Sequence, residues 1–116
     1  MASQDNAGHA PFSVVVERNE DVGLIRLVGE LDISTNEEVL AAIRQPELAG
    51  VSQWAIDCSD LTFVDSGGLR AILALAGQTG GFQHIALYEP QAQLLQLLEA
   101  AGLADAFTIR TAETPE

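Results

Sequence analysis

The sequence predicts an α/β fold: a single domain with a mixed, mostly parallel sheet and the element order β-β-α-β-α-β-α-β. Short apolar runs typical of strands alternate with segments whose apolar residues recur at helical spacing. Such alternation implies right-handed crossovers between parallel strands. The chain has 116 residues, 47% hydrophobic and 19% charged, which suits one folded core rather than two.

The N-terminal part of the domain is expected to form a β-hairpin. Two runs rich in β-branched residues, Phe12–Arg18 and Val22–Gly29, flank the charged tripeptide "NED". The first strand of this hairpin should lie antiparallel at an edge of the sheet. Residues 1–11 are expected to be a flexible leader. The domain would then span residues 12–110, followed by a polar tail at 111–116.

The first helix is expected to run from about Asn36 to Arg44. Ser34 and Thr35 each precede a glutamate by three residues, Glu37 and Glu38, which is the spacing of a capping box. The proline two residues after Arg44 should end the segment.

The second half of the chain alternates strands and helices. Strands are expected at "QWAIDC", "QHIALY" and "FTIR". One helix should begin at Ser66 and end before Gly80, and another should follow Pro90 and end at the glycine cap Gly102. Loops at the carboxyl ends of strands carry function in such sheets. Two of these loops are "GELDIST" and "CSDLTFVDSGG".

The charge of the chain excludes several classes of function. Five arginines, no lysine and seventeen carboxylates give a formal net charge of -12, whereas nucleic acids and anionic lipids attract clustered Lys and Arg. We therefore expect no nucleic-acid binding. No run of about 18 apolar residues is present, so no membrane span is expected. The start of the chain has neither a basic segment nor an apolar run, so no secretory signal is expected. We therefore expect a soluble cytoplasmic protein.

The remaining unusual residues are interpreted as structural. The single cysteine, Cys58, excludes an intramolecular disulfide and a multi-cysteine metal site, and no metal or cofactor is expected. Cys58 should be a small buried residue at a strand end, and Trp54 and Tyr88 should pack on the sheet. Leu95 and Leu98 extend the stripe of the third helix, where core packing is favoured over a partner or weak homodimer surface.

The tetrapeptide "DSGG", Asp65–Gly68, raises the question of a catalytic serine. It matches the core of "GDSGGP" in trypsin-like proteases, but Val64 and Leu69 replace the flanking residues. A triad also requires a histidine, and the chain offers only His9, in the leader, and His84, at a strand start. Both the G-x-S-x-G elbow and a lysine-containing P-loop are missing. Neither a hydrolase nor a nucleotide enzyme is expected.

Two other interpretations of Ser66 remain open. Asp65 can cap a helix by accepting from the amide of Gly67 or Gly68, so that "DSGG" is simply a helix start. Two consecutive glycines cost about 1–2 kcal/mol relative to alanine, which indicates that something approaches this backbone closely. Alternatively, Ser66 is a phosphoacceptor, since a helix N-terminus stabilises a phosphoseryl group and the glycines leave the amides uncovered.

The segments "GELDIST" and "DCSDLTFVDSGGLRAIL" resemble those of the bacterial anti-sigma factor antagonists, the small STAS-domain proteins of sporulation and general-stress regulation. The similarity runs from about Phe12 to Arg110. Its most specific part is D-S-x-G-L, preceded by a hydrophobic strand and by D-x-S. The resemblance implies a single STAS domain that is a binding module and not an enzyme.

For individual residues, the resemblance implies that Ser66 is phosphorylated by a cognate anti-sigma factor, itself a serine kinase that uses ATP. Asp65 would present the hydroxyl, and Asp32 would lie near it at the end of the neighbouring strand. The helix start contacted by the partner would comprise Gly67, Gly68 and Leu69. The unmodified protein would bind the anti-sigma factor and free the sigma factor. Phosphorylation would end binding, and a PP2C-type phosphatase would restore it.

One position departs from the family pattern. Many antagonists have a second hydroxyl residue after the serine, where this chain has Gly67, and this difference is expected to alter kinase preference. STAS domains also serve as subunits of phospholipid-transport ABC complexes. A constitutive protein-binding module of that kind, which needs no phosphorylation, is the alternative function.

Overall fold

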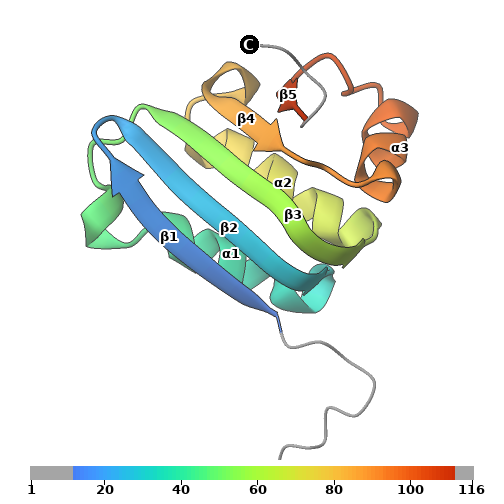
Figure 1. Ribbon diagram of the computed structural model, residues 1–116, viewed down its shortest axis with the longest axis horizontal. Helices are drawn as coiled ribbons and strands as arrows, with labels where there is room; N and C mark the ends of the chain where they lie inside the picture. The colour runs from blue at the N-terminus through green and yellow to red at the C-terminus, as the bar shows by residue number, and fades with distance from the viewer. Residues whose placement is uncertain (1–11, 112–116) are drawn as a thin grey trace, which may run out of the picture.

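The computed structural model describes residues 12–111. The leader predicted at residues 1–11 and the tail residues 112–116 lie outside this described part. Five strands and three helices follow one another in the predicted order (Figure 1). The strands are β1 (Ser13–Asn19), β2 (Val22–Leu31), β3 (Gln53–Val64), β4 (Ile85–Tyr88) and β5 (Thr108–Arg110). The helices are α1 (Asn36–Ile43), α2 (Ser66–Gln78) and α3 (Ala92–Ala100), with 3-10 turns η2 (Ile33–Thr35), η3 (Pro46–Leu48) and η4 (Phe82–His84).

The five strands form one sheet in the order β1-β2-β3-β4-β5. β1 lies at an edge and pairs antiparallel with β2, whereas the other neighbouring pairs are parallel. The predicted mixed sheet with an antiparallel edge strand is therefore confirmed. Because β2 and β3 are parallel, the segments that follow them, Asp32–Thr35 and Asp65–Gly68, emerge at the same edge of the sheet.

β3 is longer than the predicted strand. That strand ended at Cys58, but pairing with β2 continues to Val64, which lies opposite Leu31. The two polar residues that follow Cys58 hide the continuation, because backbone pairing does not require apolar side chains. The register shifts between Gly29 and Glu30, and Gly29 has a φ of 101°, a value that favours glycine and is typical of a bulge.

Other boundaries differ less. The strand predicted at residues 83–88 begins only at Ile85, because Phe82–His84 form the turn η4. α2 begins at Ser66 as predicted, and α3 begins at Ala92, two residues after Pro90. Within residues 12–111, no helix combines the length and the apolarity needed to cross a membrane.

One hydrophobic core joins the sheet to the helices. α1 and α2 lie behind the sheet in Figure 1, and Leu94 and Leu98 of α3 belong to the same buried cluster. Leu98 therefore packs in the core, as predicted. Trp54 is buried as well, but Tyr88 is 40% exposed. Tyr88 lies on the face of the sheet away from the helices, with Ala55 and Asp57, and is not part of the core.

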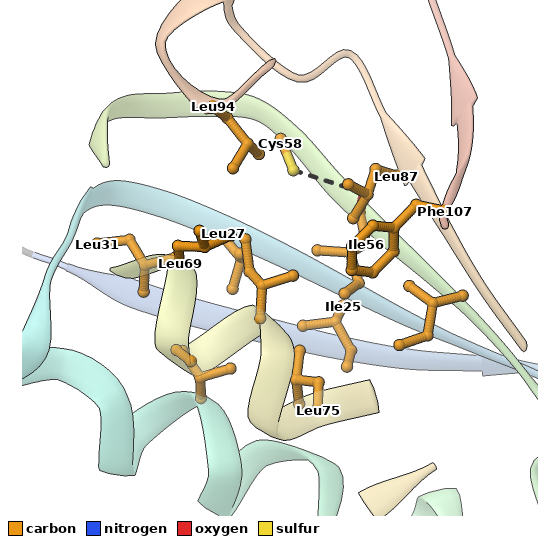
Figure 2. Packing of buried hydrophobic residues seen from close by; sticks show 14 of the residues in the cluster. Ile25, Leu27, Leu31, Ile56, Cys58, Leu69, Leu75, Leu87, Leu94 and Phe107 are labelled. Carbon is orange, nitrogen blue, oxygen red and sulfur yellow. Dashed lines mark hydrogen bonds between the residues drawn. The ribbon is translucent and has the colours of Figure 1, made fainter. Parts of the chain in front are cut away.

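Cys58 points into this core, among the side chains of Leu87 and Leu94 (Figure 2). Its Sγ lies 3.8 Å from the carbonyl oxygen of Ile56. Burial, together with the charge of Asp57, raises the pKa of the Cys58 thiol to about 12. Cys58 is thus the small buried residue that was predicted, although it lies within β3 rather than at its end.

Candidate functional site

Ser66 is the first residue of α2 and lies at the carboxyl edge of the sheet. Asp65 precedes it as the N-cap, and its Oδ1 accepts a hydrogen bond from the Gly68 amide at 2.9 Å. The predicted Asp65 cap is confirmed. Ser66 is exposed, and its hydroxyl makes no hydrogen bond with the other residues in the range 12–111. The hydroxyl is therefore free to be modified or to contact a partner.

The two glycines after Ser66 are required by the chain itself. A Cβ on Gly67 would lie 2.8 Å from the backbone nitrogen of Ile33, and a Cβ on Gly68 would overlap the carbonyl oxygen of Leu31. The group that approaches this backbone is thus the segment that follows β2. The expectation that both glycines leave their amides uncovered is wrong for Gly68, which is buried and donates its N–H to Asp65.

Asp32 directly follows β2 and caps the turn η2. Its Oδ1 accepts hydrogen bonds from the Ser34 amide at 3.0 Å and from the Ser34 hydroxyl at 2.6 Å. The Asp32 amide donates to Thr35 Oγ1 at 3.0 Å, which completes a capping box on η2. The capping box predicted between these hydroxyls and Glu37 or Glu38 is wrong. Asp32 already engages both hydroxyls, and Thr35 makes no side-chain cap on α1.

The structure brings Asp32 and Ser66 into one region. Ile33, the residue after Asp32, lies so close to Gly67, the residue after Ser66, that a Cβ on Gly67 would meet the Ile33 backbone nitrogen at 2.8 Å. This close approach joins the two predicted loops into a single surface. The side chain of Leu69 is not part of this surface, because it is only 7% exposed and packs in the core.

Two apolar side chains at this edge escaped the sequence analysis. Ile33 is 60% exposed and Phe63 is 36% exposed, although both are large hydrophobic residues. We call Ile33, Phe63, Ser66 and Gly67 the Ser66 patch. Both apolar residues stand next to strand ends, in "LDIST" and "LTFVD", where polar residues are usual. Large apolar residues at such positions are the sequence signal from which Ile33 and Phe63 could have been identified.

α3 holds the end of β3 in place. The Val64 amide donates to Gln93 Oε1 at 3.1 Å, and Gln91 Nε2 donates to the carbonyl oxygen of Leu61 at 3.3 Å. Both contacts fix the backbone just before Asp65. The sequence analysis did not single out either glutamine, because polar residues at a helix start are ordinarily solvated.

The carboxylates near Ser66 make the unmodified serine better suited than phosphoserine to a close contact with a partner protein. Asp65 and Asp32 place carboxylates in the two segments that meet here. Arg70 is exposed and lies four residues along α2 from Ser66, a spacing that places both side chains on one side of a helix. A phosphate on Ser66 would approach the carboxylates, with the helix N-terminus and Arg70 as its compensating partners.

Geometry separates Ser66 from His84, one of the two histidines considered for catalysis. His84 Nδ1 lies 3.2 Å from Nε2 of Gln53, the first residue of β3. Ser66 follows the other end of this strand, which has 12 residues and spans more than about 30 Å at roughly 3.3 Å per residue. His84 cannot reach the serine hydroxyl. Across residues 12–111, no group of His, Cys, Asp and Glu is arranged to hold a metal ion.

Comparison with known proteins adds the family context. The family model described as "Mlab, STAS domain" matches residues 14–111. The structure of the anti-sigma factor antagonist SpoIIAA in its unphosphorylated form is similar, with a TM-score of 0.69 and 23% sequence identity, over 87% of this chain and 90% of that one. SpoIIAA from Bacillus in the phosphorylated form gives a TM-score of 0.59 at 23% identity, over 87% and 94% of the two chains.

A third structure has the same fold. It is an anti-sigma factor antagonist from Mycobacterium paratuberculosis, with a TM-score of 0.69 and 18% identity, and the match covers 95% of this chain and 90% of that one. At these identities the likeness establishes the fold.

Proposed function

Because this chain belongs to the STAS-domain family, we propose that it is an anti-sigma factor antagonist switched by phosphorylation at Ser66. The observation that carries the proposal is the Ser66 patch. An exposed hydroxyl with no partner among the described residues lies at a capped helix start, at the same sheet edge as the exposed Ile33 and Phe63. Exposed apolar residues at the same end of the sheet as a modifiable hydroxyl are suited to a protein interface that modification can close.

In the unmodified state, the patch binds an anti-sigma factor that is itself a serine kinase, and the sigma factor is released. Ile33 and Phe63 supply apolar area, and Gly67 lets the turn that carries Ile33 pack closely against the start of α2. Asp65 holds the start of α2 and presents the Ser66 hydroxyl, and Asp32 fixes the neighbouring turn. Gly68 and Leu69 do not contact the partner directly. They pack the first turn of α2 against the core and so set its position.

Phosphorylation ends binding by electrostatics and sterics. The phosphoryl group adds about two negative charges to a surface that already carries Asp32 and Asp65. Enclosing that charge in a close contact is costly, and a penalty of about 3 kcal/mol weakens affinity more than a hundredfold. The fold need not change, and this chain resembles both the unphosphorylated and the phosphorylated structures of SpoIIAA. A PP2C-type phosphatase would return the protein to its binding state.

The test uses the protein as a bait in lysate of its native organism. The baits are wild type, Ser66→Ala and protein with phosphoserine incorporated at position 66 during translation. We expect wild type and Ser66→Ala to capture the same kinase-like ATPase, and the phosphoserine protein to lose it. Purified partner then gives the dissociation constants by calorimetry, with an expected loss of more than about a hundredfold for the phosphoserine protein.

Ser52→Asp is the charge control. Ser52 is exposed and lies just before β3, at the sheet edge opposite Ser66, so added charge there should leave partner capture unchanged. Equal capture by all baits, particularly of a transport ATPase, would sink the proposal. That result would favour the constitutive transport-complex subunit.

A further inference from the structure

One face of the sheet is left uncovered by residues 12–111. α1 and α2 lie behind the sheet in Figure 1, and the buried side chains of α3 join the core on their side. Four of the five strands run parallel. Parallel sheets ordinarily have both faces covered. The bare face is therefore unusual for this architecture.

This face is hollowed at its centre. The register places Leu24 and Ala55 side by side on adjacent strands, and the alanine side chain is short. Larger side chains also line the hollow, and two of them, Val15 and Tyr88, are 47% and 40% exposed. The hollow has a volume of about 610 Å³. We call it the sheet-face hollow, and its lining includes Val15, Glu17, Leu24, Ala55, Asp57 and Tyr88.

The rim of the hollow is predominantly acidic. Glu17, Asp57 and Glu89 contribute carboxylates to it, and Arg26 contributes a positive charge. Arg26 is already engaged, because its Nε lies 3.5 Å from Asp57 Oδ2 and 4.0 Å from Asp60 Oδ2. Burial alone would raise the pKa of Asp57, but hydrogen bonds from Ser59 and the charge of Arg26 outweigh burial and lower it. The Asp57 carboxylate is therefore ionised at neutral pH.

We propose that the sheet-face hollow is a second protein-docking surface, occupied by a basic amphipathic helix of a partner protein. A strand would pair with a sheet edge, whereas an apolar helix face packs on a sheet face. The acidic rim favours basic side chains beside that apolar stripe. A second copy of this chain fits poorly, because each copy carries a net charge of -12. The central ion pair keeps the surface polar enough for reversible binding.

The hollow and the Ser66 patch are separate sites. No residue that lines the hollow belongs to the patch, and the proposal does not depend on phosphorylation of Ser66. The domain could therefore hold one partner at the edge of the sheet and a second on its face.

The test probe is a synthetic peptide of about 18 residues, or five helical turns, with leucines on one face and lysines on the other. Its matched control carries glutamate in place of lysine. Both are titrated into 15N-labelled full-length protein, and amide shifts are followed by NMR. We expect the basic peptide to shift the amide signals of Leu24, Ala55, Asp57 and Tyr88. The acidic peptide should leave these signals unchanged.

Charge-matched variants separate a specific site from general attraction to an acidic protein. Glu17→Lys changes the rim, and Glu99→Lys makes the same change in net charge on the exposed surface of α3. We expect Glu17→Lys to weaken binding at least about tenfold and Glu99→Lys less than about threefold. Ala55→Phe, which fills the hollow, should also abolish the shifts.

Three results would overturn the proposal. Equal weakening by Glu17→Lys and Glu99→Lys would show non-specific attraction. Shifts confined to Ile33, Phe63 and Ser66 would assign the peptide to the other surface. A dimer seen by sedimentation in the wild type and lost in Glu17→Lys would assign the face to a second copy of the chain. Circular dichroism checks that each variant is folded.

Discussion

Gly68 lacks a side chain because of packing, not because of an unusual backbone conformation. It lies inside α2, and an added Cβ would overlap the Leu31 carbonyl oxygen and lie 2.8 Å from Val64 Cγ2. Both contacts involve strand residues that cannot move without disturbing β2 or β3. The first turn of α2 is thus held against the ends of two strands, which sets the position of Ser66.

We predict that Gly68→Ala destabilises the protein by about 1–3 kcal/mol, the usual cost of inserting a methyl group into a packed site. Gly77→Ala is the matched control in the same helix, because a Cβ at Gly77 meets nothing within 4 Å. The control should stabilise by up to about 1 kcal/mol through helix propensity. Urea unfolding followed by circular dichroism measures both changes. Equal effects of the two substitutions would contradict the packing argument.

The sequence predicted those site features that depend on neighbouring residues alone. Asp65 caps α2 as expected, because a cap needs only a side chain placed before the first turn. The capping box at Ser34 or Thr35 failed because Asp32 offered both hydroxyls a nearer partner. The packing role of Gly68 could not be predicted, because it depends on Leu31, which is distant in the sequence.

At the scale of elements, α3 supports the loop that carries Ser66. The bond from the Val64 amide to Gln93 Oε1 crosses from β3 to the first turn of α3, and Gln91 adds a bond to Leu61. Within the described residues, Gln91 Oε1 is buried without a partner, so the Gln91 contact is only partly satisfied. Gln93 is therefore the clearer positioning residue for the turn before Asp65.

We predict that Gln93→Ala accelerates hydrogen exchange of the Val64 amide by roughly fivefold to tenfold, because a lost hydrogen bond is worth about 1 kcal/mol. Gln93→Glu keeps a side-chain oxygen acceptor and should leave exchange near the wild-type rate. NMR-detected exchange at one pH measures both variants. Uniform acceleration across β3 would indicate general destabilisation instead, and no change in Gln93→Ala would remove the positioning role.

Element types were easier to predict than their ends. The alternation of strands and helices fixed the topology, since each element's apolar spacing is local. The extension of β3 from Cys58 to Val64 was missed because it depends on backbone pairing with β2. The exposure of Phe63 and Tyr88 likewise depends on which face of the sheet the helices cover.

At the scale of the whole molecule, charge is the dominant feature. The formal net charge is -12, and two ion pairs among residues 12–111 join the exposed Arg26 to Asp57 and Asp60. Exposed pairs of this kind contribute at most about 1 kcal/mol. Repulsion among the remaining carboxylates should therefore oppose folding, while the same charge favours basic partners at both proposed surfaces.

We predict that sodium chloride stabilises the protein. Raising its concentration from about 0.01 M to about 0.15 M shortens the screening length from roughly 30 Å to roughly 8 Å. Screening should weaken the net repulsion more than it weakens the few attractive pairs, so the melting temperature should rise. A gain of about 1 kcal/mol corresponds to roughly 4 °C for a domain of this size. Calorimetry at pH 7 measures this shift, and potassium chloride should reproduce it if screening is the cause.

The triple variant Glu17→Gln, Glu99→Gln, Asp105→Asn removes three exposed carboxylates. It should melt at a higher temperature than the wild type at low salt, and its melting temperature should respond less to added salt. A melting temperature that falls with added salt would mean that attractive ion pairs, not repulsion, dominate the electrostatic free energy of folding.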